Sequence, residues 1–342
     1  MAIKQVRARA PLRLGLAGGG TDLSPYCDLH GGAVLNITID RYAYASLAPS
    51  ADGALHFHAP DLDVTERHDP DGEGGQLALH AAVARRMAAM FAGGALPGVT
   101  VTSFVDAPPG SGLGSSSALV VALVEVFAAL FEAPLGPYDL ARLAYEIERI
   151  DLGMAGGRQD QYAAAFGGAN FIEFLPGERV VVNPLRVAPA VLAELETTMV
   201  ICFTGISRRS ETIIVEQQRR MAEPEGSALV DLHRLKSDAL EMKDALLRGQ
   251  IGRMATILDR SWAAKKRTAH GISTAPMEAL RDAAIAQGAL AGKVSGAGGG
   301  GFMMFMVPPE RRLAVIRALR AGGGDASGVH FTDRGVEHWL VP

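Results

Sequence analysis

Residues 108–117, with the sequence PPGSGLGSSS, place three glycines and four serines immediately before a long apolar run. Glycine has no Cβ, so a ligand can approach the backbone closely at each of these glycines. Serines at the start of a helix add hydroxyls to its free backbone N–H groups, and the positive end of the helix attracts anions. Such hydroxyls can bond phosphate oxygens or ligate Mg²⁺. The stretch therefore predicts a loop that binds phosphate groups.

This loop also fits a second interpretation, a flexible glycine–serine turn in which a serine caps the following helix. It is not the P-loop of nucleoside triphosphatases, because no Gly-Lys-Ser or Gly-Lys-Thr triplet follows the glycines. A glycine loop of this kind is weakly specific by itself. The two interpretations are separated only by the other motifs of the chain.

The elements that would position the loop are a strand at residues 98–105 and a helix over residues 118–131, whose apolar side chains recur at helical spacing. The other predicted elements are a strand at 33–48, helices at 76–92 and from Pro137 to about 150, a glycine-rich break at 153–157, a strand at 197–205, charged helices between about 207 and 290, and a glycine loop at 292–301 that leads into a strand. The composition changes near residue 170. We therefore expect two domains, residues 1–169 and residues 170–342.

The charge balance of the chain argues against polyanionic partners. Lys and Arg number 33 against 37 Asp and Glu, and the formal net charge is −4. A nucleic-acid or anionic membrane surface needs a basic patch, and neither partner is expected here. The one tight basic cluster, Lys265, Lys266 and Arg267, is interpreted as the solvated end of a helix.

Cysteine content and apolar segments predict where the protein works. Cys27 and Cys202 have no pairing motif or metal-ligand spacing, which is typical of buried thiols in a reducing compartment. Charged residues interrupt the first 15 positions, where a signal peptide would need an apolar core. The most apolar stretch, residues 118–131, is too short to span a membrane and contains Glu125. We expect a soluble, cytoplasmic protein.

Four stretches together carry a family resemblance: APLRLGLAGGGTDL at 10–23, PPGSGLGSSSA at 108–118, GGRQDQY at 156–162 and KVSGAGGGGF at 293–302. In this order they resemble the motifs of the GHMP small-molecule kinases, over nearly the whole chain. The resemblance implies a two-domain α+β fold. Its N-terminal domain would contain a left-handed βαβ unit and its C-terminal domain would be ferredoxin-like. ATP and substrate would bind between the two.

The resemblance also implies how the donor is held. The loop that would wrap the ATP phosphates comprises Pro109, Gly110, Ser111, Gly112, Leu113, Gly114, Ser115, Ser116 and Ser117. Ser116 and Glu148 match the two protein ligands of Mg²⁺ in the family. For Glu148 an ordinary helix carboxylate paired with an arginine is the alternative, and Asp151 is close enough to compete for the metal role.

The acceptor side is implied in the same way. Asp160 matches the family's catalytic base, with a loop-capping carboxylate as the alternative, and Arg13 matches the basic residue beside that base in galactokinases. Asp22 matches the aspartate that galactokinases use for sugar hydroxyls. The remaining substrate-binding candidates are Gly18, Gly19, Gly20, Thr21, Gly296, Gly298 and Gly299. The last three belong to a loop at 296–301 that would close on substrate and triphosphate, with a packing turn as the alternative.

The motifs are most like those of the branch that phosphorylates the anomeric hydroxyl of a heptose 7-phosphate, a step toward nucleotide-activated heptose for bacterial surface polysaccharide. Gly18–Gly20 stand where galactokinases carry Gly-Glu-His, which disfavours a galactose-like substrate. Ser207, Arg208 and Arg209 begin a predicted helix, where cations are disfavoured unless an anion sits among them. They are candidates for binding the remote phosphate. The alternative is that the arginines face solvent or pair with Glu211.

Other functions remain to be weighed. One is a kinase for an unphosphorylated sugar of the fucose or galactose type. Another is a catalytically silent sensor of sugar or nucleotide, which is disfavoured because Asp160, Ser116 and Glu148 are all present. The expected partners are ATP and a sugar phosphate. The sequence leaves open whether the protein is a monomer or a homo-oligomer.

Overall fold

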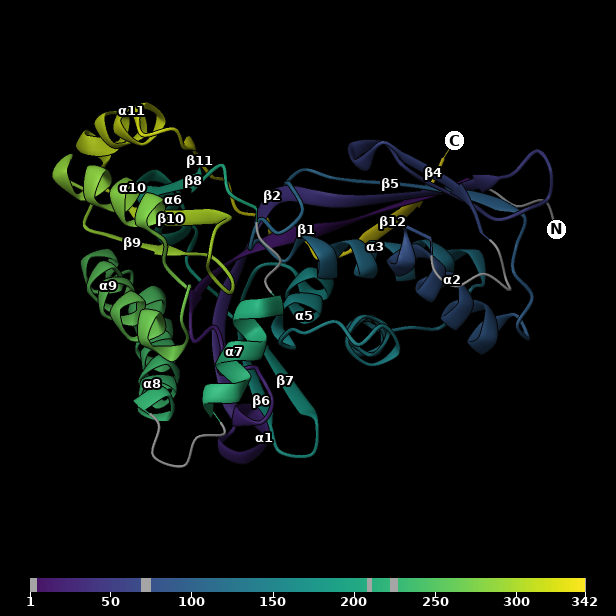
Figure 1. Ribbon diagram of the computed structural model, residues 1–342, viewed down its shortest axis with the longest axis horizontal. Helices are drawn as coiled ribbons and strands as arrows, with labels where there is room; N and C mark the ends of the chain where they lie inside the picture. The colour runs from purple at the N-terminus through teal and green to yellow at the C-terminus, as the bar shows by residue number, and fades with distance from the viewer. Residues whose placement is uncertain (1–4, 69–74, 208–210, 222–226, 342) are drawn as a thin grey trace.

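The computed structural model describes residues 5–68, 75–207, 211–221 and 227–341. Within these ranges the chain forms two β-sheets with helices packed against them. Figure 1 shows the smaller sheet with helices α8–α11 at one end of an elongated molecule, and the larger sheet with α2 and α3 toward the other. The helices in the described ranges include none long and apolar enough to cross a membrane.

The larger sheet is built around two long strands that pair in antiparallel fashion over most of their length, β1 and β2. Its strands are β1 (Val6–Ala17), β2 (Gly32–Pro49), β3 (His56–Ala59), β4 (Val64–Arg67), β5 (Val99–Val105), β6 (Ala169–Leu175), β7 (Arg179–Pro184) and β12 (Glu337–Leu340). The order is β12-β1-β2-β5-β3-β4, and β6 pairs with both β2 and β7. The sheet thus contains strands beyond residue 170. The split at 169/170 remains a prediction.

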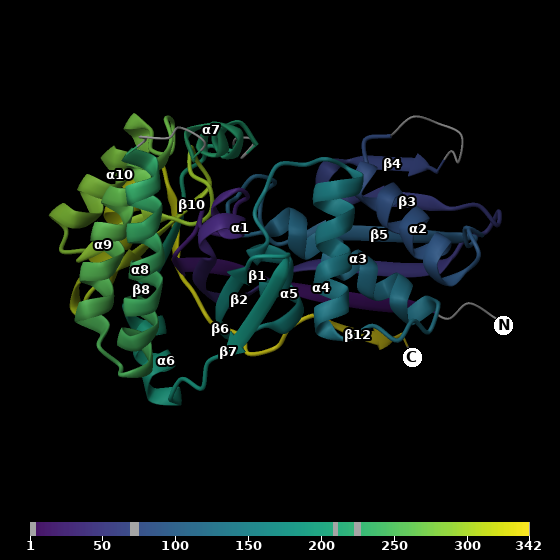
Figure 2. The same ribbon diagram turned by 90° about the horizontal axis from the view of Figure 1, so that it is seen from below.

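One parallel pair, β3 with β5, is connected through β4 and helix α2, which is a βαβ connection. The helices of this half are α1 (Tyr26–His30), α2 (Ala78–Phe91), α3 (Ser115–Leu130), α4 (Pro137–Tyr145) and α5 (Gln159–Phe166), with the short turns η1 (Pro60–Leu62) and η2 (Glu146–Asp151). Figure 2 shows α2, α3 and α4 lying over one face of the sheet. Helix α3 packs on β1 and β2 and is buried along most of its length, as its broad apolar face predicts.

The smaller sheet has the order β11-β8-β10-β9 with antiparallel neighbours throughout, which is the ferredoxin-like arrangement expected. Its strands are β8 (Met199–Phe203), β9 (Ala291–Val294), β10 (Phe302–Met306) and β11 (Asp325–Gly328). The helices of this half are α6 (Pro189–Thr198), α7 (Glu211–Met221), α8 (Ser227–Leu247), α9 (Ile251–Thr268), α10 (Ala275–Ala286) and α11 (Arg312–Ala321), with the 3₁₀ turn η3 (Pro309–Arg311).

Helices α8 and α9 pack closely on each other, and both also contact β1 of the larger sheet. The glycine loop at 295–301 connects β9 to β10. The expected thiols are found, since Cys27 and Cys202 are buried and free, and burial raises the pKa of each to about 12. Neither cysteine is therefore a reactive thiolate at neutral pH.

Candidate active site

The glycine–serine loop ends in the first turn of α3, as predicted. Gly114 is the residue before the helix, and its left-handed φ of 76° is a conformation that favours glycine. No side chain of the described residues caps this end of the helix, and the N-cap position is Gly114, so the interpretation of a serine as the N-cap is wrong. The first-turn N–H groups of α3 therefore remain available to an anion.

A second glycine loop, between β9 and β10, docks onto the first. A Cβ on Gly112 would lie 2.3 Å from the Ser295 carbonyl oxygen, so the two backbones touch only because that position is glycine. The Phe302 N–H donates to the Ser111 carbonyl oxygen at 2.8 Å. Ser111 is fully buried, as is Leu113, whose carbonyl oxygen accepts from the Arg13 N–H. These two members of the predicted phosphate loop hold its shape.

Arg13 and Asp160 form the ion pair that the resemblance implies. Arg13 lies on β1, and its Nε and Nη2 approach Asp160 Oδ1 at 2.8 Å and 2.7 Å. Asp160 lies in the first turn of α5. The Arg13 Nη1 also donates to the Gly112 carbonyl oxygen at 2.7 Å, and this connects the ion pair to the predicted phosphate loop. The Arg13 side chain is 5% exposed, whereas that of Asp160 is 21% exposed and can be reached by a substrate.

The loop that follows β1 is held by its own polar side chains. Thr21 is fully buried, and its hydroxyl donates toward the carbonyl oxygens of Gly18 and Ala33, so it fixes the turn. Asp22 accepts from the backbone N–H of Gly20 at 3.1 Å and of Gln159 at 3.3 Å. A Cβ on Gly18 would lie 2.0 Å from the Ala33 carbonyl oxygen, which requires glycine there.

Glu148 is the centre of a buried hydrogen-bond network at the start of α3. It lies in the π-helical turn η2, and the Ser116 and Ser117 hydroxyls donate to its two carboxylate oxygens at 2.6 Å and 2.7 Å. Gln161 Nε2 donates to Glu148 Oε2 at 2.7 Å. Arg149 Nη1 lies 3.4 Å from Glu148 Oε1, which is the arginine pairing named as the alternative for this residue, and Asp151, the competing carboxylate, faces Arg86 at 3.5 Å. The geometry therefore brings Glu148, and not Asp151, together with Ser116.

Two buried lysines were not predicted as site residues. Lys265 on α9 is 5% exposed, and its Nζ donates to the Gly19 carbonyl oxygen at 2.9 Å. The interpretation of this residue as part of a solvated helix end is wrong, because the face of α9 that carries it packs inward, whereas Lys266 pairs with Glu278 at 3.1 Å. Lys293 on β9 is 8% exposed and donates to the Gly15 carbonyl oxygen at 2.6 Å.

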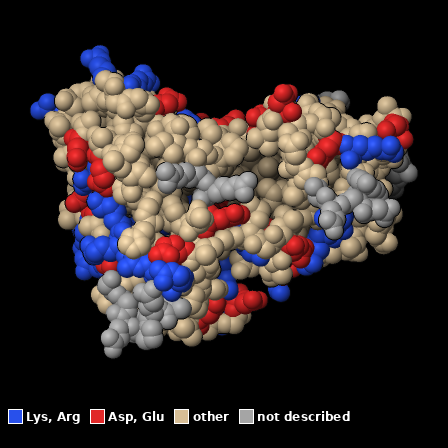
Figure 3. All heavy atoms as spheres, viewed as in Figure 1, with Lys and Arg blue, Asp and Glu red and all other residues tan. Residues whose placement is uncertain are grey.

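The face drawn in Figure 3 is hollowed between the two ends of the molecule, and acidic side chains lie in this hollow. Two cavities have lining residues from both halves of the molecule, and the larger has a volume of about 650 Å³. Residues of the predicted phosphate loop that line the larger cavity are Pro109, Gly110, Gly112, Gly114, Ser115, Ser116 and Ser117. Glu148 lines it as well.

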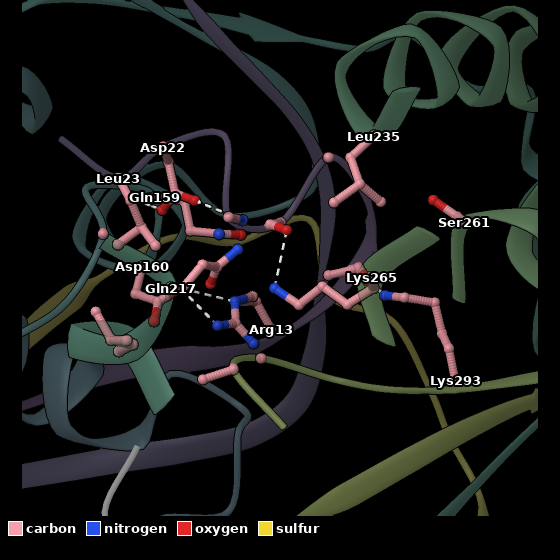
Figure 4. A pocket seen from close by; sticks show the side chains of 18 residues that line it. Arg13, Asp22, Leu23, Gln159, Asp160, Gln217, Leu235, Ser261, Lys265 and Lys293 are labelled. Carbon is pink, nitrogen blue, oxygen red and sulfur yellow. Dashed lines mark hydrogen bonds and ion pairs between the residues drawn. The ribbon is translucent and has the colours of Figure 1, made fainter. Parts of the chain in front are cut away.

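The smaller cavity lies on the other side of the Arg13–Asp160 pair. Its lining includes Gly18, Gly19, Gly20, Asp22, Lys265 and Lys293. Figure 4 shows Lys265 and Lys293 reaching in from the side opposite Asp160. Arg13 and Asp160 line both cavities, so the two spaces meet at this ion pair.

The other predicted substrate residues fall in different places. Gly296 lines both cavities, whereas Gly298 and Gly299 pack against Ile272, where the Gly299 N–H donates to a carbonyl oxygen at 2.8 Å. Ser207 lines the larger cavity, and its hydroxyl donates to the Pro109 carbonyl oxygen. The predicted Arg208 and Arg209 lie outside the described residues.

Comparison with known proteins identifies the family of the chain. Residues 78–168 match the family model for the GHMP kinases N terminal domain, and residues 242–325 match the model for GHMP kinases C terminal. Together these matches cover about half of the chain. The protein therefore belongs to the GHMP kinase family.

Several similar proteins are named as sugar kinases. The chain is 42% identical, over 99% of its length and 100% of the relative's, to a protein of Campylobacter jejuni named D-glycero-alpha-D-manno-heptose 7-phosphate kinase. A crystal structure of a D-glycero-D-manno-heptose 1-phosphate kinase from Bacteroides thetaiotaomicron is 40% identical, with a TM-score of 0.82 and coverage of 98% of this chain and 99% of that one. The structure of a putative sugar kinase from Campylobacter jejuni is 42% identical, with a TM-score of 0.82 and full coverage of both chains.

Proposed function

We propose that this protein transfers the γ-phosphoryl group of ATP to the anomeric hydroxyl of D-glycero-D-manno-heptose 7-phosphate, giving the 1,7-bisphosphate. Membership of a kinase family implies ATP as the donor. The names of the similar proteins support a phosphorylated heptose as the acceptor. The product would feed nucleotide-activated heptose for surface polysaccharide.

The observation that carries the proposal is the junction of two cavities at one ion pair. The larger cavity contains the phosphate loop and the start of α3, which suits a nucleotide triphosphate. The smaller cavity is lined by polar groups that include Asp22, Lys265 and Lys293, and no residue of 108–117 is among its described lining residues, which suits the acceptor. A phosphoryl group can pass from one to the other only where they meet, and Arg13 and Asp160 lie at that point.

In the proposed reaction the Asp160 carboxylate accepts the proton of the anomeric hydroxyl. The hydroxyl oxygen then forms a bond to the γ-phosphorus as the bond from that phosphorus to the bridging β–γ oxygen breaks, and ADP leaves. Arg13 holds the carboxylate at 2.7–2.8 Å and presents positive charge where negative charge develops on the transferred group. Backbone N–H groups of the loop from Gly110 to Gly114 orient the phosphates.

Ser116 and Glu148 fit a magnesium site. Mg²⁺ prefers oxygen ligands and is typically held by one or two protein groups together with substrate phosphates. The Ser116 hydroxyl and the Glu148 carboxylate supply two such oxygens, 2.6 Å apart, beside the phosphate loop. The described residues contain no cluster of three or more His, Cys, Asp or Glu side chains that could hold a metal by itself. When bound, Mg²⁺ would neutralise charge on the β- and γ-phosphates.

Activity toward a panel of acceptors tests this proposal. ADP release would be measured with heptose 7-phosphate, free heptose, fucose, galactose and mevalonate as acceptors at the same ATP concentration. We expect heptose 7-phosphate to give a kcat/KM several powers of ten above that of any free sugar. A free sugar that equals or exceeds heptose 7-phosphate would move the protein to the unphosphorylated-sugar kinases. No turnover with any acceptor, together with retained ATP binding, would favour the silent sensor.

A further inference from the structure

The smaller cavity is lined by more cationic side chains than carboxylates, and its carboxylates do not pair with all of the cations. Its charged lining residues are Arg13, Lys265, Lys293, Asp22 and Asp160. Asp160 is paired with Arg13, and Asp22 accepts backbone N–H groups. Among the described residues, neither lysine forms an ion pair with a carboxylate. Each ammonium donates to one backbone carbonyl oxygen, although it has three N–H bonds to offer.

Two buried ammonium groups without counter-ions are costly to keep. Burial, together with the positive charge of Arg13, lowers the pKa of Lys265 to about 8. Burial, together with the positive charges of Lys265 and Arg13, lowers the pKa of Lys293 to about 7. Asp22 acts in the opposite direction on Lys265. A methionine or leucine would fill the same space without this cost. An anion bound by both lysines would neutralise this buried positive charge.

The lysines lie at a distance from the reacting end of the cavity. Lys293 bonds the carbonyl oxygen of Gly15, which is two residues beyond Arg13 on β1 and so about 6–7 Å along the strand. Lys265 bonds the carbonyl oxygen of Gly19, farther along the same segment. In Figure 4 both side chains enter from the side opposite Asp160. An acceptor with its anomeric hydroxyl at Asp160 would thus extend its other end toward the lysines.

We propose that Lys265 and Lys293 bind the phosphate group that the acceptor sugar already carries, and that they thereby select phosphorylated over free sugars. This inference rests on the proposed function, since it assigns one end of the same acceptor. A phosphate dianion accepts several charge-assisted hydrogen bonds, and the two ammonium groups have N–H bonds left to supply them. The fixed contacts to Gly15 and Gly19 hold both lysines in place before the sugar binds.

This assignment differs from the one based on sequence, which gave the remote phosphate to Ser207, Arg208 and Arg209. The described residues on either side of 208–210 are Ser207 and Glu211, and both line the larger cavity. Ser207 also bonds the phosphate loop through Pro109. Ser207 and Glu211 therefore lie on the nucleotide side of the site, whereas Lys265 and Lys293 line the acceptor side.

The test compares Lys265→Met and Lys293→Met with wild type, using heptose 7-phosphate and free heptose as acceptors. Methionine keeps the length of the apolar stem and removes the charge. We expect kcat/KM for heptose 7-phosphate to fall by about 10- to 100-fold in each variant, through KM, because a charge-assisted contact is lost. We expect kcat/KM for free heptose and KM for ATP to change by less than about threefold. Lys266→Met is the matched control, since Lys266 pairs with Glu278, and should leave both sugars unaffected.

The outcomes separate this inference from the proposed function. If wild type shows no preference for the phosphorylated sugar, the proposed substrate is wrong. If wild type prefers it and both lysine variants retain that preference, the substrate stands and the lysine site is wrong. An equal loss with both sugars would mean that the lysines only support the loop through Gly15 and Gly19, which also overturns the site. If Lys265→Met fails to fold, Lys265→Arg replaces it in the test. Because Lys265→Arg keeps the charge, it should retain the preference for the phosphorylated sugar.

Proton uptake on binding gives a second readout that a supporting role would not produce. At pH 8 the phosphate of the free sugar phosphate is already a dianion. At this pH Lys293, with a pKa of about 7, is largely neutral, and Lys265, with a pKa of about 8, is partly neutral. A bound dianion favours their charged forms, so heptose 7-phosphate should take up protons as it binds. Calorimetry in two buffers of different ionisation enthalpy measures this directly. Uptake with heptose 7-phosphate but not with free heptose supports the site, and equal values for the two sugars contradict it.

Discussion

The Asp160→Asn variant should turn over about 10²–10⁴-fold more slowly than wild type, because this is the range that loss of a general base typically costs. Asparagine has nearly the same shape as aspartate and can still accept a hydrogen bond from Arg13, so the fold and the phosphate loop should be preserved. What it lacks is the proton affinity of a carboxylate. Single-turnover kinetics with heptose 7-phosphate would measure the loss in the chemical step.

Binding measurements provide the control for this variant. The dissociation constants of ATP and of heptose 7-phosphate should change by less than about tenfold, since Asp160 contributes proton transfer rather than most of the binding energy. A variant with near wild-type kcat would show that Asp160 is not the base. In that case the carboxylate would be restricted to holding Arg13 against the loop at Gly112.

Replacement of Glu148 should give the second largest loss of activity, and this loss should depend on the Mg²⁺ concentration. Glu148→Gln keeps an acceptor for one of the two serine hydroxyls but removes the negative charge that faces the larger cavity. Replacement of a residue that supports a metal ligand typically costs roughly 10–100-fold in metal affinity. We expect the Mg²⁺ concentration for half-maximal rate to rise by at least that factor in Glu148→Gln. Ser116→Ala should move the same curve in the same direction by a smaller factor, because a neutral ligand is lost.

The matched control for Glu148 is the neighbouring carboxylate in the same π-helical turn. Asp151→Asn removes one charge that faces Arg86, and its Mg²⁺ curve should coincide with that of wild type. A shift with Asp151→Asn and none with Glu148→Gln would assign the metal to Asp151. The Tm of each variant should be measured without nucleotide beside both Mg²⁺ titrations. Glu148 is fully buried, so its replacement also lowers the stability of the fold.

The parts of the site that the sequence predicts are those whose backbone conformation requires a particular residue type. Gly112 and Gly114 have left-handed φ values, and Gly112 meets another backbone at a distance that excludes a side chain. Such requirements are visible in a sequence as glycine runs at fixed spacing. The long apolar helix α3 is predicted for a similar reason, because its pattern reflects burial against one sheet.

Lys265 and Lys293 are harder to predict from the sequence. A Lys-Lys-Arg run is ordinarily solvated, and only the packing of α9 against β1 and β9 turns Lys265 inward while Lys266 stays at the surface. The available signal was the helical phase of α9, since Leu258, Ser261 and Trp262 are buried on the same face as Lys265. Lys293 sits within an apolar four-residue strand, where a lysine is unusual.

The distinction between Glu148 and Asp151 also depends on tertiary structure. Both carboxylates follow the same helix, and the spacing along the chain allows either to reach the serines. The π-helical turn η2 changes the phase of the backbone by one residue, and this directs Glu148 inward toward Ser116 and Ser117 and Asp151 toward Arg86. A π-turn has no dependable sequence signature, so only the structure settles which side chain faces the loop.

The most direct test of the account is to identify the position of the new phosphate in the product. Heptose 7-phosphate would be converted with ATP and Mg²⁺, and the product would be examined by ¹H and ³¹P nuclear magnetic resonance. The account predicts two phosphomonoester signals from the sugar, one of them coupled to the anomeric proton, with one ADP released for each molecule of product. A new phosphate on any other hydroxyl, or ADP release without a phosphorylated sugar, would contradict transfer at the junction of the two cavities.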